Sequence, residues 1–121
     1  MKKLGFPEIP VFVIEKDKKS QAKKVLEEAS EFLEAMKNYE KDNTSENRKR
    51  VLEEGADVYQ ALMNAFEMIL ASNATLEEEA MFCFARNYAR GRFEAYEKKE
   101  KENTKTYLGN ISDIICSKSF Y

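Results

Sequence analysis

Acidic residues recur at the same spacing in two stretches of the chain. VLEEASEFLEAM begins at position 25, and VLEEGADVYQAL begins at position 51. In a helix each residue turns by about 100°, so Glu28 lies at the edge of an apolar stripe and Glu31 lies one turn further on. Glu54 and Asp57 take the same places in the second copy. Each copy therefore offers two carboxylates, three residues apart, beside an apolar seam.

The register of the two copies predicts that these four carboxylates meet. Glu31 and Glu54 are equally far in sequence from a turn near Asp42, and so are Glu28 and Asp57. In an antiparallel helical hairpin, residues placed symmetrically about the turn lie at similar height. Carboxylates gathered beside an apolar seam repel one another, so they must spread into solvent, take up protons or bind a cation.

The composition narrows the kind of site. The chain has no His, which excludes a Ser-His-Asp triad, an HExxH zinc site and a Glu-x-x-His di-iron bundle. Cys83 and Cys116 fit no zinc spacing and are interpreted as free thiols in a reducing compartment. Oxygen ligands alone suit Mg²⁺ or Mn²⁺, and Mg²⁺ usually recruits phosphates, which indicates phosphoryl or nucleotidyl chemistry.

The alternative to a cation site is a solvated acidic face, which is what a single acidic pair on a helix usually forms. Glu27 and Glu53, next to the matched pairs, point away from the seam and fit that description. Gly55 costs roughly 1 kcal/mol relative to Ala inside a helix. Close approach of the neighbouring helix would explain this glycine, and simple tolerance is the other explanation.

The elements that must position these residues are helical. Of 121 residues, 43% are hydrophobic and 35% are charged, with four Gly and two Pro, which favours one all-α domain. Apolar spacing and capping residues predict helices over 18–38, from a cap at Asn43 or Thr44 to about residue 72, and from TLEE at Thr75 to about residue 99. We expect an antiparallel bundle of three to four helices, with an extended lead-in over 1–17 and a charged linker and apolar tail over 100–121.

EEASE followed by EGAD has the form E-E-x-x-E, a spacer, and E-x-x-D. This pattern resembles the signature of the MazG-like all-α nucleoside triphosphate pyrophosphohydrolases, whose relatives include dCTP/dUTP pyrophosphatases and phosphoribosyl-ATP pyrophosphohydrolase. The resemblance covers about residues 20–95, and the short chain looks like the phage or prophage-type members. It implies that Glu28, Glu31, Glu54 and Asp57 are the catalytic metal ligands, with Mg²⁺ as cofactor and Mn²⁺ as a possible substitute.

RNYARGRF, from Arg86 to Phe93, resembles the downstream segment of that family. Asn87, Arg90 and Gly91 match it, but Cys83 stands where the family usually has Lys. Arg86 or Arg90 could supply positive charge to phosphate instead, which makes Asn87, Arg86 and Arg90 candidate substrate-binding residues. The alternative is a solvated basic helix end, favourable to the helix dipole.

Lys24 on the first helix is a further candidate for phosphate binding, with Lys23 beside it, and ordinary surface lysines are the alternative. Four aromatic residues could wall a base pocket, although packing in the core or against a second subunit is the more common role of such spacing: Phe82, Phe84, Tyr88 and Phe93.

The sequence thus predicts a cytoplasmic, Mg²⁺-dependent enzyme that cleaves a nucleoside triphosphate to the monophosphate and pyrophosphate. The resemblance implies a homodimer or homotetramer. A net charge of −2 and a pI of about 5.4 argue against nucleic acid as a partner, and no apolar run is long enough to span a membrane. Two alternatives stay open: a phosphoribosyl-ATP pyrophosphohydrolase-like enzyme, and a catalytically silent helical adaptor or regulatory phage protein.

Overall fold

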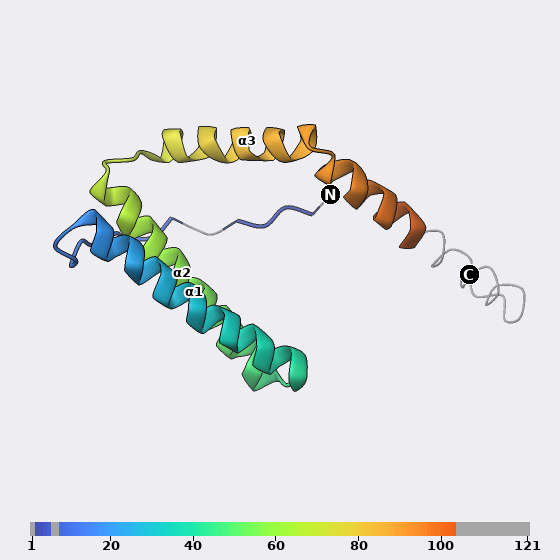
Figure 1. The fold of residues 1–121 in the computed structure, drawn as a ribbon, viewed down its shortest axis with the longest axis horizontal. Coiled ribbons are helices and arrows are strands. Elements are labelled where there is room, and N and C mark those ends of the chain that lie inside the picture. Colours follow the sequence, from blue (N-terminus) through green and yellow to red (C-terminus); the bar gives the residue numbers. More distant parts are fainter. Residues whose placement is uncertain (1, 6–7, 104–121) are drawn as a thin grey trace, which may run out of the picture. The chain divides into compact units, whose positions relative to one another are not determined.

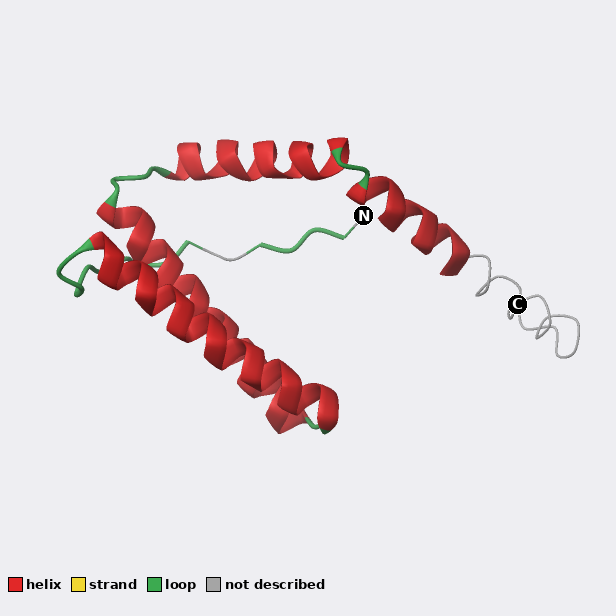
Figure 2. Cartoon of the chain, in the orientation of Figure 1, coloured by secondary structure: helices red, strands yellow, loops and turns green. Residues whose placement is uncertain are grey.

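The computed structural model describes residues 2–5 and 8–103, and the described part is helical without strands. Its helices are α1 (Lys18–Lys41), α2 (Ser45–Met68) and α3 (Asn73–Ala89), followed by a helical segment over 92–103 (Figures 1 and 2). The all-α prediction is confirmed. The predicted apolar tail lies outside the described residues.

The chain divides into two compact units, residues 1–72 and residues 73–121. The first unit holds α1 and α2, which pack against each other as an antiparallel hairpin (Figure 1). The second unit holds α3 and the helical segment over 92–103. All four predicted carboxylates belong to the first unit.

Polar side chains cap the N-terminus of each helix of the hairpin and tie its turn. Asp17 caps α1 by accepting a hydrogen bond from the Ser20 amide at 2.7 Å, and this bond lowers the pKa of Asp17 below its usual value. Thr44 caps α2, as predicted, by accepting from the Asn47 amide at 3.1 Å. The Asn47 side chain donates to the Asp42 carbonyl at 2.8 Å, which ties the end of α1 to the start of α2.

Small residues let the two helices approach closely. Ala35 and Ala61 are the buried hydrophobic residues of the described chain. Gly55 faces Phe32 of α1, and a Cβ built at Gly55 would lie 3.4 Å from a Phe32 ring carbon. This is an ordinary van der Waals distance, so an Ala side chain would fit at Gly55, and tolerance of glycine, the second of the two explanations, is the one that the contact favours. The predicted stripe is otherwise partly exposed: Leu33 and Met36 of α1 and Ile69 after α2 remain exposed.

The end of α2 comes earlier than the predicted residue 72. Leu70 adopts a left-handed conformation with φ of 56°, and its amide donates to the Glu67 carbonyl at 3.0 Å. The Ala71 amide donates to the Phe66 carbonyl at 3.1 Å. These bonds satisfy the last carbonyls and stop the helix at Met68.

The predicted third helix is wrong at both ends. It begins at Asn73, so Thr75 lies inside the first turn instead of capping it, and it ends at Ala89 instead of near residue 99. Gly91 has φ of 76°, a left-handed conformation that glycine adopts without a Cβ penalty. The break turns one expected helix into two, and Phe93 packs against Phe84 and Tyr88 across it, with ring centroids 5.8 and 5.2 Å apart.

Residues 8–17 of the lead-in form no strand, and this part of the chain contacts α2. The Phe12 amide donates to Asn64 Oδ1 at 3.0 Å, and Gln60 Nε2 donates to the Pro10 carbonyl at 3.0 Å. Within the described residues, none of the helices combines the length and the apolar character needed to cross a bilayer.

Candidate metal centre

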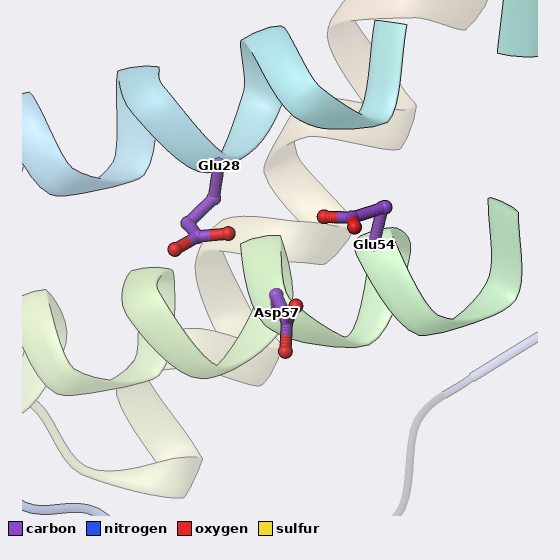
Figure 3. A group of neighbouring side chains, drawn as sticks. All are labelled: Glu28, Glu54 and Asp57. Carbon is purple, nitrogen blue, oxygen red and sulfur yellow. The ribbon is translucent and has the colours of Figure 1, made fainter. Parts of the chain in front are cut away.

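Three carboxylates from two helices converge inside the hairpin. Glu28 projects from α1 towards α2, where Glu54 and Asp57 lie on consecutive turns (Figure 3). Each of the three offers one oxygen, and these oxygens lie within 4.8 Å of one another. The position of the turn explains this meeting, because the antiparallel register places the two acidic copies at one level.

Burial makes the cluster more than a surface feature. Glu54 is only 5% exposed, and the Glu28 side chain is 13% exposed, whereas Asp57 is open to solvent. The cluster therefore has a closed side formed by two glutamates and an open side at Asp57. A ligand can reach the carboxylates from the Asp57 side.

Glu54 has one satisfied oxygen and one orphan. Arg50, one turn earlier on α2, donates to Glu54 Oε1 at 2.9 Å. Glu54 Oε2 is buried without a hydrogen-bond partner. Burying a charged acceptor without a partner costs folding free energy. A bound cation or an added hydrogen-bond donor would remove this cost at Glu54 Oε2.

Glu31, the fourth predicted ligand, lies outside this group of three but close enough to sense its charges. Its carboxyl has a pKa raised above the usual value, chiefly because the Glu28 charge lies close by, with desolvation and the hydrogen-bonding proximity of Glu54 adding to the effect. Glu31 itself is exposed. The four predicted carboxylates therefore form one electrostatically coupled group, in which Glu31 feels the charges of both helices.

The cluster carries more negative charge than its own cations neutralise. Lys24 pairs with Glu28 at 3.0 Å, and the Glu28 hydrogen bond and charge raise the pKa of Lys24. Arg50 is the second neighbouring cation. Four carboxylates against these two cations leave two negative charges, which one divalent cation would balance.

The adjacent glutamates of the repeat are outside the site. The Glu27 and Glu53 side chains are 68% and 54% exposed. Glu53 pairs with Lys49 at 3.8 Å, and Glu27 lies 3.9 Å from Lys24. They are solvated residues of the same type on the same helices, and they serve as matched controls for the cluster.

A pocket of about 240 Å³ lies beside the carboxylates within the first unit. Glu28 and Asp57 line it together with Lys24, so the open side of the cluster continues into this space. Its remaining lining comes from α1, α2 and the N-terminal segment: Phe12, Ile14, Glu15, Gln21, Gln60, Ala61 and Asn64.

Sequence reasoning missed the amides of this pocket. Gln21 and Asn64 are 3% and 6% exposed. Gln21 Nε2 donates to the Ala61 carbonyl at 2.9 Å, and Gln60 Nε2 donates to Asn64 Oδ1 at 2.9 Å. One signal was available: Asn is a poor helix former, and Asn64 stands in the apolar run ALMNAF, where a buried amide must find a partner.

The other substrate-binding candidates lie in the second unit. Asn87 Oδ1 accepts from Arg92 at 2.8 Å, and Asn87 Nδ2 lies 3.8 Å from Cys83 Sγ. Arg86 is in the last turn of α3, and the Arg90 amide donates to its carbonyl at 3.1 Å. Roles for Asn87, Arg86 and Arg90 in phosphate binding stay predictions.

The donor set fits a hard divalent cation. Four carboxylates without imidazole or thiolate favour Mg²⁺ or Mn²⁺ over zinc or copper, and the orphan Glu54 Oε2 is a free ligand atom within the hairpin. Comparisons with family models, curated proteins and solved structures found no match to this chain. A cation site is therefore inferred from the residues of the cluster and not from a related protein.

Proposed function

We propose that this chain is a Mg²⁺-dependent nucleoside triphosphate pyrophosphohydrolase, which cleaves a (d)NTP to the (d)NMP and pyrophosphate. The observation that carries the proposal is the meeting of Glu28, Glu54 and Asp57, with one buried carboxylate oxygen left without a partner. The motif resemblance E-E-x-x-E…E-x-x-D supports it, because the three residues that meet are among the four ligands that the resemblance implies.

Glu28, Glu31, Glu54 and Asp57 would hold the metal. When bound, Mg²⁺ supplies charge neutralisation for phosphate oxygens and lowers the pKa of a coordinated water. Glu28 and Glu54 would offer ligand oxygens from the buried side, and Asp57 would offer one from the exposed side. Lys24 lines the adjacent pocket and adds a positive charge that a phosphate chain entering from that side would meet.

A general base has to orient the attacking water and accept its proton. Glu28 and Glu31 are both candidates from the motif. Glu28 Oε1 forms an ion pair with Lys24 Nζ at 3.0 Å, so this oxygen is already engaged. Glu31 forms no such ion pair with a cation of the described residues. We therefore assign the base to Glu31.

Pyrophosphate release across a panel of the common NTPs and dNTPs with MgCl₂ tests the function. Glu54→Gln keeps the shape of the side chain but removes a ligand charge, so activity should fall by at least 100-fold. Glu53→Gln changes the neighbouring, solvated glutamate and should stay within twofold of the wild type. Equal activity of the two variants would show that the carboxylates are not the ligands.

One observation favours a second candidate, a silent adaptor that keeps the scaffold. Lys24 and Arg50 already pair with Glu28 and Glu54, as in a purely structural ion-pair network. Such a protein would release no pyrophosphate from any substrate of the panel, and Mg²⁺ would not raise its melting temperature. A phosphoribosyl-ATP pyrophosphohydrolase would be distinguished by adding phosphoribosyl-ATP to the same panel.

We also propose that the enzyme is a homo-oligomer. The hairpin buries few apolar side chains and leaves large ones exposed, which a second copy would cover: Leu26, Leu33, Met36 and Leu52 are 71%, 55%, 44% and 56% exposed. Light scattering coupled to size exclusion should give a mass of two or four chains. A 14.1 kDa species at micromolar concentration would refute this.

A further inference from the structure

The pocket beside the carboxylates has one wall that is not helical. α1 and α2 form two sides, and the third side is the N-terminal segment over residues 10–15, here called the strap. Phe12, Ile14 and Glu15 of the strap line the pocket. Nothing in the metal-ligand motif requires this segment, so its attachment to the hairpin needs its own explanation.

Two amides on α2 hold the strap by its backbone. Gln60 Nε2 donates to the Pro10 carbonyl at 3.0 Å, and Asn64 Oδ1 accepts from the Phe12 amide at 3.0 Å. Gln60 also donates to Asn64 Oδ1 at 2.9 Å, which fixes the two amides relative to each other. Residues four apart on a helix are separated by about 6 Å, close to the roughly 6.6 Å between alternate residues of an extended chain.

This attachment determines which side chains face the pocket. Successive side chains of an extended chain point to opposite sides. Phe12 and Ile14 line the pocket, and Val11 and Val13 between and before them do not. Glu15, in the bend that leads into α1, lines it as well, and the four apolar side chains keep 42–79% of their surface exposed. Gln60 and Asn64 are thus positioning residues, because they set the direction of the Phe12 ring without having to touch a ligand.

The pocket suits one flat ring system. Its volume of about 240 Å³ is below the roughly 300–1,000 Å³ of pockets that enclose drug-sized ligands. The lining combines an aromatic ring with side-chain amides, which stack on and hydrogen-bond to a heteroaromatic ring. Gln21 at one end and Glu28 at the other are seven residues apart on α1, or about 10 Å along its axis.

We propose that the strap is the substrate-selecting wall of the site, with the nucleobase stacked on Phe12 and the phosphates directed towards Glu28 and Asp57. This inference rests on the proposed function for the identity of the ligand. Phe12 is then a specificity-determining residue, and Gln60 and Asn64 act through it. The carboxylates perform the hydrolysis, and the strap decides which nucleotide reaches them.

The absence of tryptophan from the chain gives a direct binding test. Phe12→Trp introduces a single fluorophore on the pocket side of the strap, and Val13→Trp introduces one on the other side. Each variant is titrated with dAMP, dGMP, dCMP and dTMP in 5 mM MgCl₂. We expect saturable quenching of at least 30% in Phe12→Trp with one or more of them, and no saturable change in Val13→Trp. Silence of both variants, or an equal response, would overturn the proposal.

Kinetics give the second test. Phe12→Ala should raise KM about tenfold, in line with the loss of one base–aromatic stack, with kcat within twofold. Gln60→Ala should shift KM in the same direction, and Val13→Ala should change neither constant. A fall in kcat at constant KM for Phe12→Ala would contradict a selecting role.

The two proposals fail separately. If the wild type releases no pyrophosphate from the panel but Phe12→Trp is quenched, the hydrolase assignment fails and the strap remains a nucleotide-binding wall. If the wild type is active and neither Phe12 variant differs from its Val13 control, the strap proposal fails and the hydrolase stands.

Discussion

Asp57→Asn should stabilise the metal-free protein and destabilise it relative to the wild type once Mg²⁺ is added. Asp57 is the exposed member of the cluster, and none of the ion pairs in the described part of the chain includes it. Its carboxylate oxygen lies within 4.8 Å of oxygens of Glu28 and Glu54. Neutralising Asp57 therefore removes two repulsions without breaking an attraction.

The size of the gain follows from Coulomb's law. Two unit charges 4.8 Å apart repel by about 0.9 kcal/mol in water, and the solvent exposure of Asp57 makes the value for water the appropriate one. At 0.15 M salt the screening length is about 8 Å, which leaves roughly half. The two pairs together give about 1 kcal/mol, or roughly 4–8 °C in melting temperature for a unit of 60–100 residues.

Mg²⁺ acts in the opposite direction. A cation at 100 times its dissociation constant stabilises the native state by about 2.7 kcal/mol, more than the roughly 1 kcal/mol that the substitution gains. If Asp57→Asn loses most of its affinity for the cation, the order of stability must reverse between EDTA and saturating MgCl₂.

Differential scanning fluorimetry in EDTA and in 10 mM MgCl₂ measures both effects on one plate. Glu53→Gln, on the same helix, is the control. Because it changes a surface residue, its melting temperature should lie within about 1 °C of the wild type. The reasoning is refuted if Asp57→Asn melts at or below the wild type in EDTA, or if Mg²⁺ raises both proteins by the same amount.

Three further predictions concern the hairpin. Proximity of Glu28 raises the pKa of Glu31 above 4.5, so the folded state holds this proton more tightly than the unfolded chain. The stability of the metal-free protein should therefore fall as pH rises from 4.5 through the raised pKa. When the free energy of unfolding is measured with urea at several pH values, its fall with pH should be smaller in Glu31→Gln. Gly55→Ala places its Cβ 3.4 Å from Phe32, an ordinary contact, and should raise stability by up to about 1 kcal/mol through helix propensity, a gain that a lower urea midpoint would contradict. Thr44→Ala removes the cap of α2 and should cost about 1 kcal/mol by the same urea measurement, whereas Thr44→Ser should cost little.

The sequence predicts the hairpin well because the two features that determine it, the helix cap at the turn and the spacing of the acidic residues about the turn, lie close together in the sequence. The cap at Thr44 and the polar turn determine where α2 begins, and the symmetric spacing of Glu31 and Glu54 about that turn determines which residues face each other. The burial of Glu54 at 5% goes beyond the pattern, which places it only at the edge of the stripe. The packing of α1 against α2 covers this carboxylate, and the depth of that packing is not visible in a wheel position.

The third helix shows where local signals mislead. TLEE has the form of a capping box, but α3 already begins at Asn73. Gly91 could be tolerated within a helix at modest cost, and the sequence does not state whether it will adopt a positive φ. Contacts between Phe93 and the rings of Phe84 and Tyr88 accompany the break, and such contacts between residues on either side of a turn are not visible to a periodicity argument.

Packing of the strap on the helices could be expected from the lack of a partner strand, but its attachment points could not, since they join residues about 50 positions apart. A segment that pairs with side-chain amides instead of another strand shows no hairpin signal and no partner strand. The informative residue is Asn64, buried within an apolar helical run. A buried amide in such a run has to satisfy a backbone group from elsewhere, and here that group is the Phe12 amide. A polar residue that a helix buries at a cost in propensity can therefore indicate the segment that docks on that helix.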